Sequence, residues 1–490
     1  MSTEQTPPAA QAQEEAGQGP GVGVDEWVAR SSGRREYAPG RLGQAQRLLE
    51  RVPWWVALLA AGLAGACVPL LTTNDFQLQV GINALLLAIL AVGLNISVGW
   101  AGLLDLGYIA FYGFGAYAFA LVSSNQLNPP DGIHLPTLVS VPAIMIAAAI
   151  LGLAVGWPSR RLIGDYLAIV TLFFGEAFVE FTNNVAPSKL GGPNGIVGID
   201  PYKIFGSTIL TNKGYFYVLL VLLVLTVGVL HLIDTSRTGR AWRAVREDPL
   251  ASTMMTIPVN RVKLMAFAFG AAVAAMAGTV FAAQQVNVFP TDFATPFLIL
   301  IYAGLILGGA GSLPGAVLGG LILSITLNGF LRSTTEAGYI FYGLILATMV
   351  VKIRPWARLG AILAATAVFG IVVHAIVKAI SPSAVAGGPQ SSGWISDLVH
   401  NWVIVPSNPQ HFGNISYVVL LILVVALVQV KGRWRDILMV PTLYLAACVW
   451  EGVLVAQPSV TRQILLGVIL IVMMNARPNG LLGRRRVEVV

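Results

Sequence analysis

Long apolar runs, separated by short polar stretches, dominate the chain from Pro53 onward. A helix needs roughly 17 to 25 mostly apolar residues to cross a bilayer, and about 14 runs approach or reach that length. The candidate spans are residues 53–71, 80–98, 104–123, 138–157, 164–182, 214–233, 263–285, 294–308, 314–331, 338–352, 359–380, 413–430, 437–455 and 461–475. Because 294–308 and 338–352 are short enough to be tilted, broken or re-entrant, we set the range at about 10 to 14 spans. The pattern predicts an all-α, polytopic transmembrane helical bundle.

The N-terminal region lacks this pattern. Residues 1–52 are rich in Gln, Glu, Pro, Gly and Ala and hold few large apolar side chains, which predicts a disordered cytoplasmic tail. We expect no cleavable signal peptide, because the first apolar run begins only near Pro53. The remaining chain divides into a transmembrane core at 53–352, a further membrane segment with an outer loop at 353–458, and a final span with a basic cytoplasmic tail at 459–490.

The distribution of basic residues predicts the orientation of these spans. With the N-terminus inside, 24 of the 30 lysine and arginine residues fall in inner loops and 6 fall outside. Cytoplasmic loops collect Lys and Arg, so both termini are expected to be cytoplasmic. The composition agrees with a membrane protein, since 56% of residues are hydrophobic and only 11% charged. The net charge of +7 is therefore no sign of nucleic-acid binding.

One polar loop, residues 236–249, stands between two long apolar runs. It carries arginines at intervals of three, which on a helix form one inclined basic ridge: Arg237, Arg240, Arg243 and Arg246. Asp248 is expected to cap a second short helix whose first position is Pro249. This pattern predicts a small helical hairpin at the cytoplasmic face that binds another protein. The alternative is that the arginines only set the topology or touch anionic lipid.

Motifs for catalysis or nucleotide binding are weak. The chain has no Gly-Lys dipeptide and hence no phosphate-binding loop, and the glycine-rich stretch 308–315 favours a tight turn and close helix packing. The five histidines are scattered, and Cys67 and Cys448 lack metal-ligand spacing. No catalytic residue or metal site is predicted. A membrane enzyme acting on lipid would need an acidic pair or a nucleophile grouping, which we do not find.

Few ionisable side chains fall within the candidate spans. Asn83, Asn95 and Glu176 are the candidates for lining a solute pathway, because buried polar groups in membranes are costly and usually serve a function. For Glu176 a functional and a structural role stay equally open. An ion-driven secondary carrier usually has more charged residues at mid-depth. The sparse set favours a pore for a small uncharged or zwitterionic solute, with energy supplied from elsewhere.

Five stretches, taken in order, resemble the permease subunits of ABC importers for branched-chain amino acids. The form Gly-Leu-Leu-x-Leu-Gly-Tyr is similar to the larger of the two paired permeases and fits it better than urea-type permeases. The stretches are 102–108 with 113–117, 164–176 with 191–196, the loop 239–249, the turn 308–315, and Arg-Pro-Asn-Gly-Leu-Leu at 477–482.

This resemblance implies an importer subunit in a bacterial cytoplasmic (inner) membrane, surrounded by lipid. It implies a sister permease in a heterodimer, two ATP-binding subunits that hydrolyse ATP, and an extracytoplasmic solute-binding protein. No cofactor would bind this chain directly, and the chain itself would not be an enzyme. The loop residues that would dock onto an ATP-binding subunit are Gly239, Arg240, Arg243, Arg246, Glu247 and Asp248. The alternatives are a urea or amide ABC permease and an ion-coupled secondary carrier.

Two departures from the family stand out. The family usually has a glycine shortly before the lysine at which the next membrane span begins, whereas this chain has Met255-Thr256-Ile257-Pro258 there. The second loop helix is therefore expected to end differently. In addition, about a hundred residues between Pro355 and Pro458 look inserted before the final span. We expect this block to be a peripheral appendage outside the pore.

Overall fold

The protein is described by a computed structural model that covers residues 53–72, 74–127, 132–159, 165–185, 187–204, 206–330, 356–382, 402–405, 409–430 and 432–451, with shorter pieces of 338–353, 463–474 and 480–483. The chain divides into two compact units, residues 1–63 and 64–490, each considered by itself. The predicted tail 1–52, most of the predicted outer loop, and residues 477–479 lie outside the described residues.

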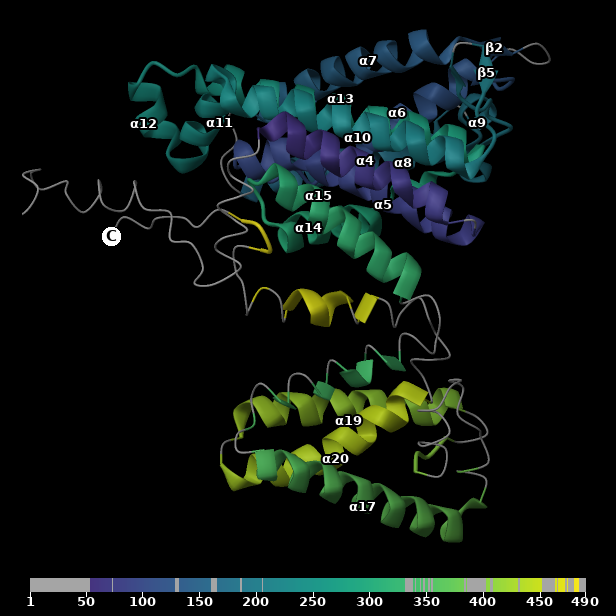
Figure 1. Ribbon diagram of the computed structural model, residues 1–490, viewed down its shortest axis with the longest axis vertical. Helices are drawn as coiled ribbons and strands as arrows, with labels where there is room; N and C mark the ends of the chain where they lie inside the picture. The colour runs from purple at the N-terminus through teal and green to yellow at the C-terminus, as the bar shows by residue number, and fades with distance from the viewer. Residues whose placement is uncertain are drawn as a thin grey trace, which may run out of the picture. The chain divides into compact units, whose positions relative to one another are not determined.

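Helices make up most of the described chain, which confirms the all-α prediction (Figure 1). Eight helical stretches are long and apolar enough to cross a membrane, by length and composition alone: Trp54–Leu71, Asp75–Trp100, Thr137–Pro158, Tyr166–Asn184, Asn212–Thr235, Val259–Gln285, Pro290–Gly308 and Trp356–Ile380. Three shorter apolar helices are Tyr108–Val122, Leu313–Gly329 and Ile415–Leu427. The span count of about 14 and the cytoplasmic termini stay predictions.

The helices of the transmembrane core follow the predicted spans closely. Their bounds are α4 Trp54–Leu71, α5 Asp75–Leu94, α6 Tyr108–Val122, α7 Thr137–Ser159, α8 Asp165–Asn184, α9 Pro187–Leu190, α10 Asn212–Thr235, α11 Arg237–Glu247, α12 Pro249–Met254, α13 Val259–Gln285, α14 Thr295–Gly308 and α15 Leu313–Ile325. Short helices of other types are the π-helices η2 Asn95–Trp100 and η5 Thr326–Phe330 and the 3₁₀ helices η3 Gly192–Asn194 and η4 Pro290–Phe293.

Helix α13 lies at the centre of the core, against α5, α6 and α7. Glycines allow its main chain to approach α6 closely. A Cβ atom on Gly115 would lie 2.2 Å from the Ala275 carbonyl oxygen, and one on Gly278 would lie 2.1 Å from that of Tyr112. Such contact between small residues is the usual way membrane helices associate, because lipid provides no hydrophobic drive.

One predicted boundary was wrong. The span expected at 104–123 begins only at Tyr108, because residues 101–107 form a turn after η2. Gly102 has the left-handed φ of +69°, which ends the helix before it. Asp105 then accepts a hydrogen bond from the Gly107 amide at 3.1 Å, a short-range side-chain bond that competes with a helix.

The loops at the end of the bundle opposite α11 and α12 form three antiparallel two-stranded pairs (Figure 1). These pairs are β1 Ser123–Ser124 with β2 Ile133–His134, β3 Ile196–Val197 with β6 Asn287–Val288, and β4 Lys203–Ile204 with β5 Ser207–Thr208. Strands this short had not been expected from the sequence.

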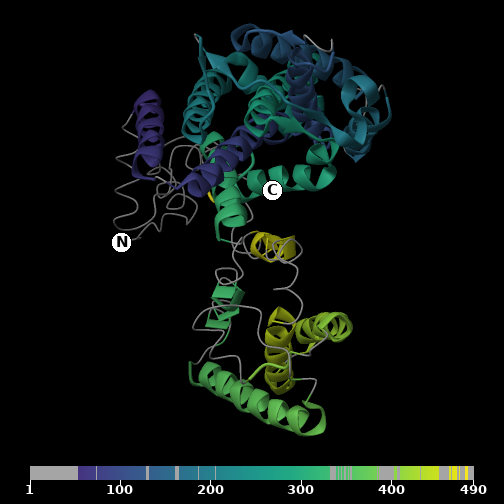
Figure 2. The same ribbon diagram turned by 90° about the vertical axis from the view of Figure 1, so that its right-hand side faces the viewer.

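Three long helices follow in the region predicted as inserted: α17 Trp356–Ile380, α19 Pro409–Gln429 and α20 Arg433–Val449 (Figure 2). Arg358 of α17 donates to Asp436 of α20 with its Nε at 2.8 Å. Trp402 donates to the Ala367 carbonyl at 3.0 Å and packs edge-on against Tyr444. These contacts give the region a small core of its own, while its peripheral role stays a prediction.

Candidate functional site

The loop after α10 folds as the predicted helical hairpin. Ser236 caps α11 by accepting a hydrogen bond from the Thr238 amide at 3.2 Å. Asp248 caps α12 by accepting from the amides of Leu250 at 2.8 Å and Ala251 at 3.1 Å, with Pro249 as the first helical residue. The predicted cap and the predicted start of the second helix are thus confirmed. The caps satisfy amides that the helix itself cannot bond, so the hairpin has fixed ends.

Two buried residues attach α11 to the core. A Cβ atom on Gly239 would lie 2.3 Å from the Asp234 carbonyl oxygen, so only glycine allows α11 to turn this tightly against α10. Trp242 is fully buried and its indole N–H donates to the Val262 carbonyl at 2.8 Å. The hairpin is therefore a packed part of the permease rather than a loose loop.

The arginines do not form a single outward ridge. Arg243 donates to the Asp234 carboxylate, and its Nη2 donates to the Asp234 carbonyl at 3.1 Å. Arg246 reaches back to the carbonyl of Gly99 in η2. Arg240 is exposed and donates to the Thr235 carbonyl at 3.0 Å. All three predicted docking arginines thus bond within the chain, and of the three only Arg240 is exposed, because three-residue spacing turns successive side chains toward different neighbours.

The outward surface of the hairpin is apolar and acidic. Leu250, Met254 and Met255 are 76%, 82% and 77% exposed, and Glu247 and Asp248 lie beside them. The sequence analysis missed the apolar residues, although Leu250 and Met254 are four apart and thus share a helix face. Exposed methionine is typical of adaptable protein-binding surfaces. We name residues 240, 247, 248, 250, 254 and 255 the hairpin surface.

The turn after α12 lacks the glycine that the family usually has. Thr256, just after α12, has a left-handed φ of +62°. A β-branched residue seldom adopts that conformation, whereas glycine adopts it readily. Thr256 therefore holds conformational strain that a glycine would not, while the expectation that the second loop helix ends differently from the family's stays a prediction.

Three of the five motifs meet beneath the hairpin, which is itself a fourth. The Asn95 side-chain oxygen accepts from the Gly311 amide at 2.7 Å, which joins η2 to the turn between α14 and α15. The Leu481 and Leu482 amides donate to the carbonyls of Leu307 at 2.9 Å and Gly308 at 3.0 Å. Residues 102–108 follow η2 directly. Every contact in this convergence uses the main chain on at least one side.

The three predicted pathway residues have different surroundings. Asn95 is fully buried, Asn83 is half-buried on α5, and Glu176 is exposed on α8. Glu176 accepts a hydrogen bond from the Thr295 hydroxyl at the start of α14. It lies on an exposed stripe of α8 with Tyr166, Ile169, Phe173, Glu180 and Asn184. A stripe that holds two carboxylates is costly against lipid, so it suits a watery pathway or a partner.

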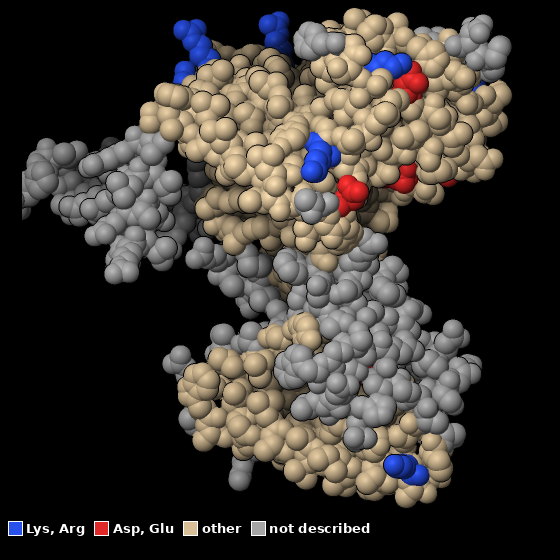
Figure 3. All heavy atoms as spheres, turned by 45° about the vertical axis from the view of Figure 1, so that its right-hand side comes forward, with Lys and Arg blue, Asp and Glu red and all other residues tan. Residues whose placement is uncertain are grey.

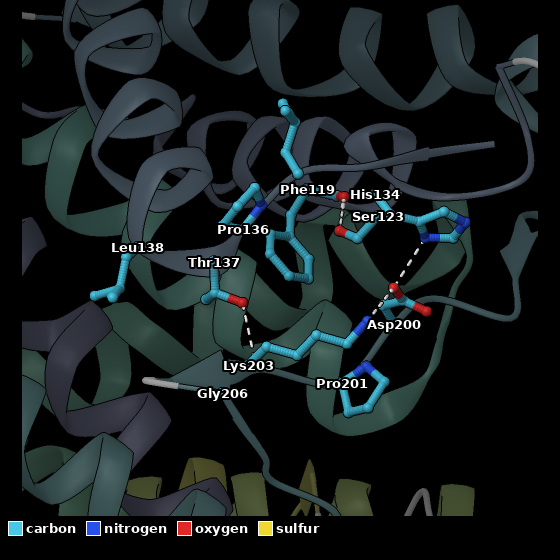
Figure 4. Close-up of a pocket in the computed structure, with 11 residues that line it drawn as sticks. Phe119, Ser123, His134, Pro136, Thr137, Leu138, Asp200, Pro201, Lys203 and Gly206 are labelled. Carbon is cyan, nitrogen blue, oxygen red and sulfur yellow. Dashed lines mark hydrogen bonds and ion pairs between the residues drawn. The ribbon is translucent and has the colours of Figure 1, made fainter.

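A pocket of about 340 Å³ opens among the short strands at the other end (Figure 4). Asp200 pairs there with His134 at 2.9 Å and with Lys203 at 3.1 Å. His134 also contacts the Asn125 side-chain oxygen at 3.1 Å. The polar groups mostly satisfy one another, so this pocket stands apart from the hairpin surface in chemistry as well as in place. Elsewhere, the face drawn in Figure 3 carries few charged side chains.

Residues 76–351 match the family described as the branched-chain amino acid transport system permease component. The chain belongs to this family. The match covers most of the helices from α5 to α15, together with the hairpin and η2. It begins after α4 and ends before α17, so α4, α17, α19 and α20 lie outside the family match.

Curated relatives are consistent with this family. The chain is 36% identical over 287 residues to the high-affinity branched-chain amino acid transport system permease protein LivM of Escherichia coli (strain K12), covering 54% of this chain and 65% of the relative. It is 29% identical over 281 residues to the permease protein LivH of Salmonella typhimurium, covering 54% and 88%. A probable LivM of Methanocaldococcus jannaschii is 28% identical, covering 46% and 66%. No solved structure matches the chain.

Proposed function

We propose that this protein is a permease subunit of an ABC importer that moves leucine, isoleucine and valine across the bacterial inner membrane. Its partners would be a sister permease, two ATP-binding subunits and an extracytoplasmic solute-binding protein. ATP would bind and be hydrolysed on the partner subunits. The similarity to both LivM and LivH, two permeases named for the same transport system, supports a paired assembly.

The hairpin surface is the observation that carries this proposal. It presents a capped α12 with two exposed apolar side chains, Leu250 and Met254. Neighbouring exposed apolar side chains are typical of a surface that binds a partner. An apolar patch beside Glu247 and Asp248 fits a groove that has apolar walls and a basic rim. Such a groove on an ATP-binding subunit would bind α12, and movement of that subunit would then displace α12 and α11 together. Arg240 is the arginine best placed to join this contact.

We also propose that the exposed stripe of α8 faces the solute pathway, with the second permease completing the other wall. Glu176 and Glu180 lie on this stripe, and the Glu180 carboxylate accepts a hydrogen bond from Nδ2 of the Asn184 side chain at 2.7 Å. The carboxylates suit the ammonium group of an amino acid, while Phe173 and Ile169 suit its apolar side chain. Asn83 is the second pathway candidate, whereas Asn95 bonds to Gly311 within the core.

The test is to purify the tagged protein in mild detergent from its own host and measure co-eluting ATPase activity. The wild type should bring ATPase activity with it, and Leu250→Asp should lower that activity at least tenfold, because it places a charge in the apolar contact. Leu210→Asp is the matched control, since Leu210 is also 76% exposed but lies near the short strands. Purified assemblies in vesicles, with the binding protein and ATP, would then be tested for uptake of each amino acid.

Three outcomes would contradict the proposal or one of its parts. Wild-type protein that elutes without ATPase activity, yet moves solute on an ion gradient, would make it a secondary carrier. Uptake of urea or an amide without uptake of leucine, isoleucine or valine would assign it to the related permeases. Equal ATPase activity with Leu250→Asp and Leu210→Asp would remove α12 from the docking surface.

A further inference from the structure

The hairpin has a second side, which faces the core instead of a partner. Arg246 donates to the carbonyl of Gly99, and the Trp242 ring stacks on Trp100 with centroids 5.8 Å apart and planes 21° apart. Gly99 and Trp100 are the last two residues of η2. The C-terminal half of α11 therefore contacts the end of a π-helical turn from a different part of the chain.

The same turn is tied to α14 and α15. Asn95, the first residue of η2, accepts from the Gly311 amide at 2.7 Å. A Cβ atom on Gly311 would lie 2.8 Å from Nη1 of Arg246, and one on Gly102 would lie 2.8 Å from its Cγ. Both glycines have left-handed φ, +93° and +69°. The Arg246 side chain thus lies between η2 and the 308–312 turn. A side chain larger than hydrogen at position 102 or 311 would crowd it.

Polar atoms around η2 are incompletely bonded. The Asn95 amide nitrogen, the Trp100 indole nitrogen and the Tyr108 hydroxyl have no hydrogen-bond partner in the described part of the chain. All three side chains are at most 1% exposed. A buried donor without a partner costs about 1–3 kcal/mol. π-helical turns are themselves rare and concentrate at functional sites. Because its present arrangement leaves these donors unbonded, η2 has little hydrogen bonding of its own side chains to hold it in place, which makes it a candidate for movement.

We propose that Arg246 and Trp242 are positioning residues that couple movement of α11 to η2 and, through Asn95, to the turn between α14 and α15. The proposal rests on the ABC importer function above. In it, the outward side of the hairpin meets the ATP-binding subunit and the inward side carries the movement onward. Arg246 then acts through the Gly99 carbonyl and not through a contact with the partner. Physical coupling between two sites requires an element with two arrangements, and each site must shift the balance between them.

The test compares Arg246→Gln, Arg246→Lys and the wild type in assembled complexes. Arg246→Gln should still co-elute with at least half of the ATPase activity, while the leucine moved per ATP hydrolysed falls at least tenfold. Arg246→Lys can still donate to the Gly99 carbonyl and should keep this ratio within threefold of wild type. Arg261→Gln is the matched control, because Arg261 is an exposed arginine at the start of α13 and should leave both readouts unchanged.

Each outcome has one meaning. A wild-type complex without ATPase activity would defeat the importer function itself. Loss of ATPase co-elution with a folded Arg246→Gln protein would make Arg246 a docking residue, which overturns the coupling proposal and leaves the importer function standing. An unchanged ratio of leucine to ATP would also overturn it. If Arg246→Gln does not fold, Trp242→Phe decides: it loses the indole hydrogen bond to Val262 and part of the stack on Trp100, so the ratio should fall, and a ratio equal to wild type would refute the coupling.

Discussion

The contact between Arg243 and Asp234 offers the sharpest test of how the hairpin is held. The Asp234 side chain is 13% exposed and that of Arg243 is 37% exposed. Buried charge-assisted hydrogen bonds are worth about 1.5–3 kcal/mol, whereas exposed ion pairs give about 0.2–1 kcal/mol. After allowing for solvent screening at the Arg243 end, we expect about 1–2 kcal/mol for the pair. Arg243→Gln should lower the free energy of local opening of α11 by that amount.

Chymotrypsin cleavage after Trp242 measures this opening, because Trp242 is fully buried in the closed hairpin. When closing is faster than cleavage, the rate follows the population of the open form. A loss of about 1–2 kcal/mol should speed cleavage roughly 5- to 30-fold. Asp234→Asn should do the same, and the double variant should add little more, since both changes remove one interaction.

Arg261→Gln should cleave at the wild-type rate. The reasoning is refuted if Arg243→Gln stays within twofold of wild type, or if the effects of the two single variants multiply in the double variant. This result also bears on docking experiments. A charge reversal such as Arg243→Glu would place a carboxylate beside Asp234, so a loss of partner binding could come from an opened hairpin. Leu250→Asp avoids that ambiguity, because Leu250 is 76% exposed.

Two further predictions concern backbone positions. Thr256→Gly should relieve the left-handed strain of about 1–2 kcal/mol and lose about 0.5–1 kcal/mol to chain entropy, so it should slow cleavage after Trp242 a few-fold. Met255→Gly is the control, because φ of Met255 is −84°, and it should speed this cleavage. Faster cleavage with Thr256→Gly than with Met255→Gly would contradict the strain at Thr256. Gly278→Ala should destabilise the protein by about 1–3 kcal/mol, because its Cβ would lie 2.1 Å from the Tyr112 carbonyl oxygen. Its thermal unfolding in detergent should fall below that of wild type, while Gly360→Ala, with nothing within 4 Å of its Cβ, should not lower it.

Hydrophobic length and capping chemistry predicted the helices well. The span expected at 214–233 is α10 at Asn212–Thr235, and the cap expected at Asp248 forms with the bonds that its carboxylate allows. These features depend on neighbouring residues alone, so local patterns suffice for them. The predicted start of α6 was wrong by four residues because the turn before it is mostly apolar, and only the left-handed Gly102 and the Asp105 side chain distinguish it from a helix.

The roles of the arginines could not be predicted in the same way. Spacing tells which side of α11 a residue is on, but not what lies there. Arg246 bonds to Gly99, 147 positions earlier in the chain, and Arg243 bonds to Asp234 on the preceding helix. The apolar hairpin surface was overlooked for a related reason, since Leu250 and Met254 in a membrane protein look like part of a span. Only their exposure distinguishes them.

The glycine-rich stretch 308–315 was interpreted as a packing element, and its contacts explain why the motifs meet where they do. A Cβ atom on Gly308 would lie 1.9 Å from the Gly315 carbonyl oxygen, so α14 and α15 touch through their main chains. The Gly311 amide is bonded by Asn95, and the Gly308 carbonyl accepts from Leu482. Main-chain atoms have no side-chain freedom to absorb a shift. Displacing α11 must therefore move η2, the 308–312 turn and residues 480–482 together, or break the hydrogen bonds that join them. This rigidity supports the proposal that the hairpin is more than an anchor, because movement of α12 would be passed to three separate segments of the permease.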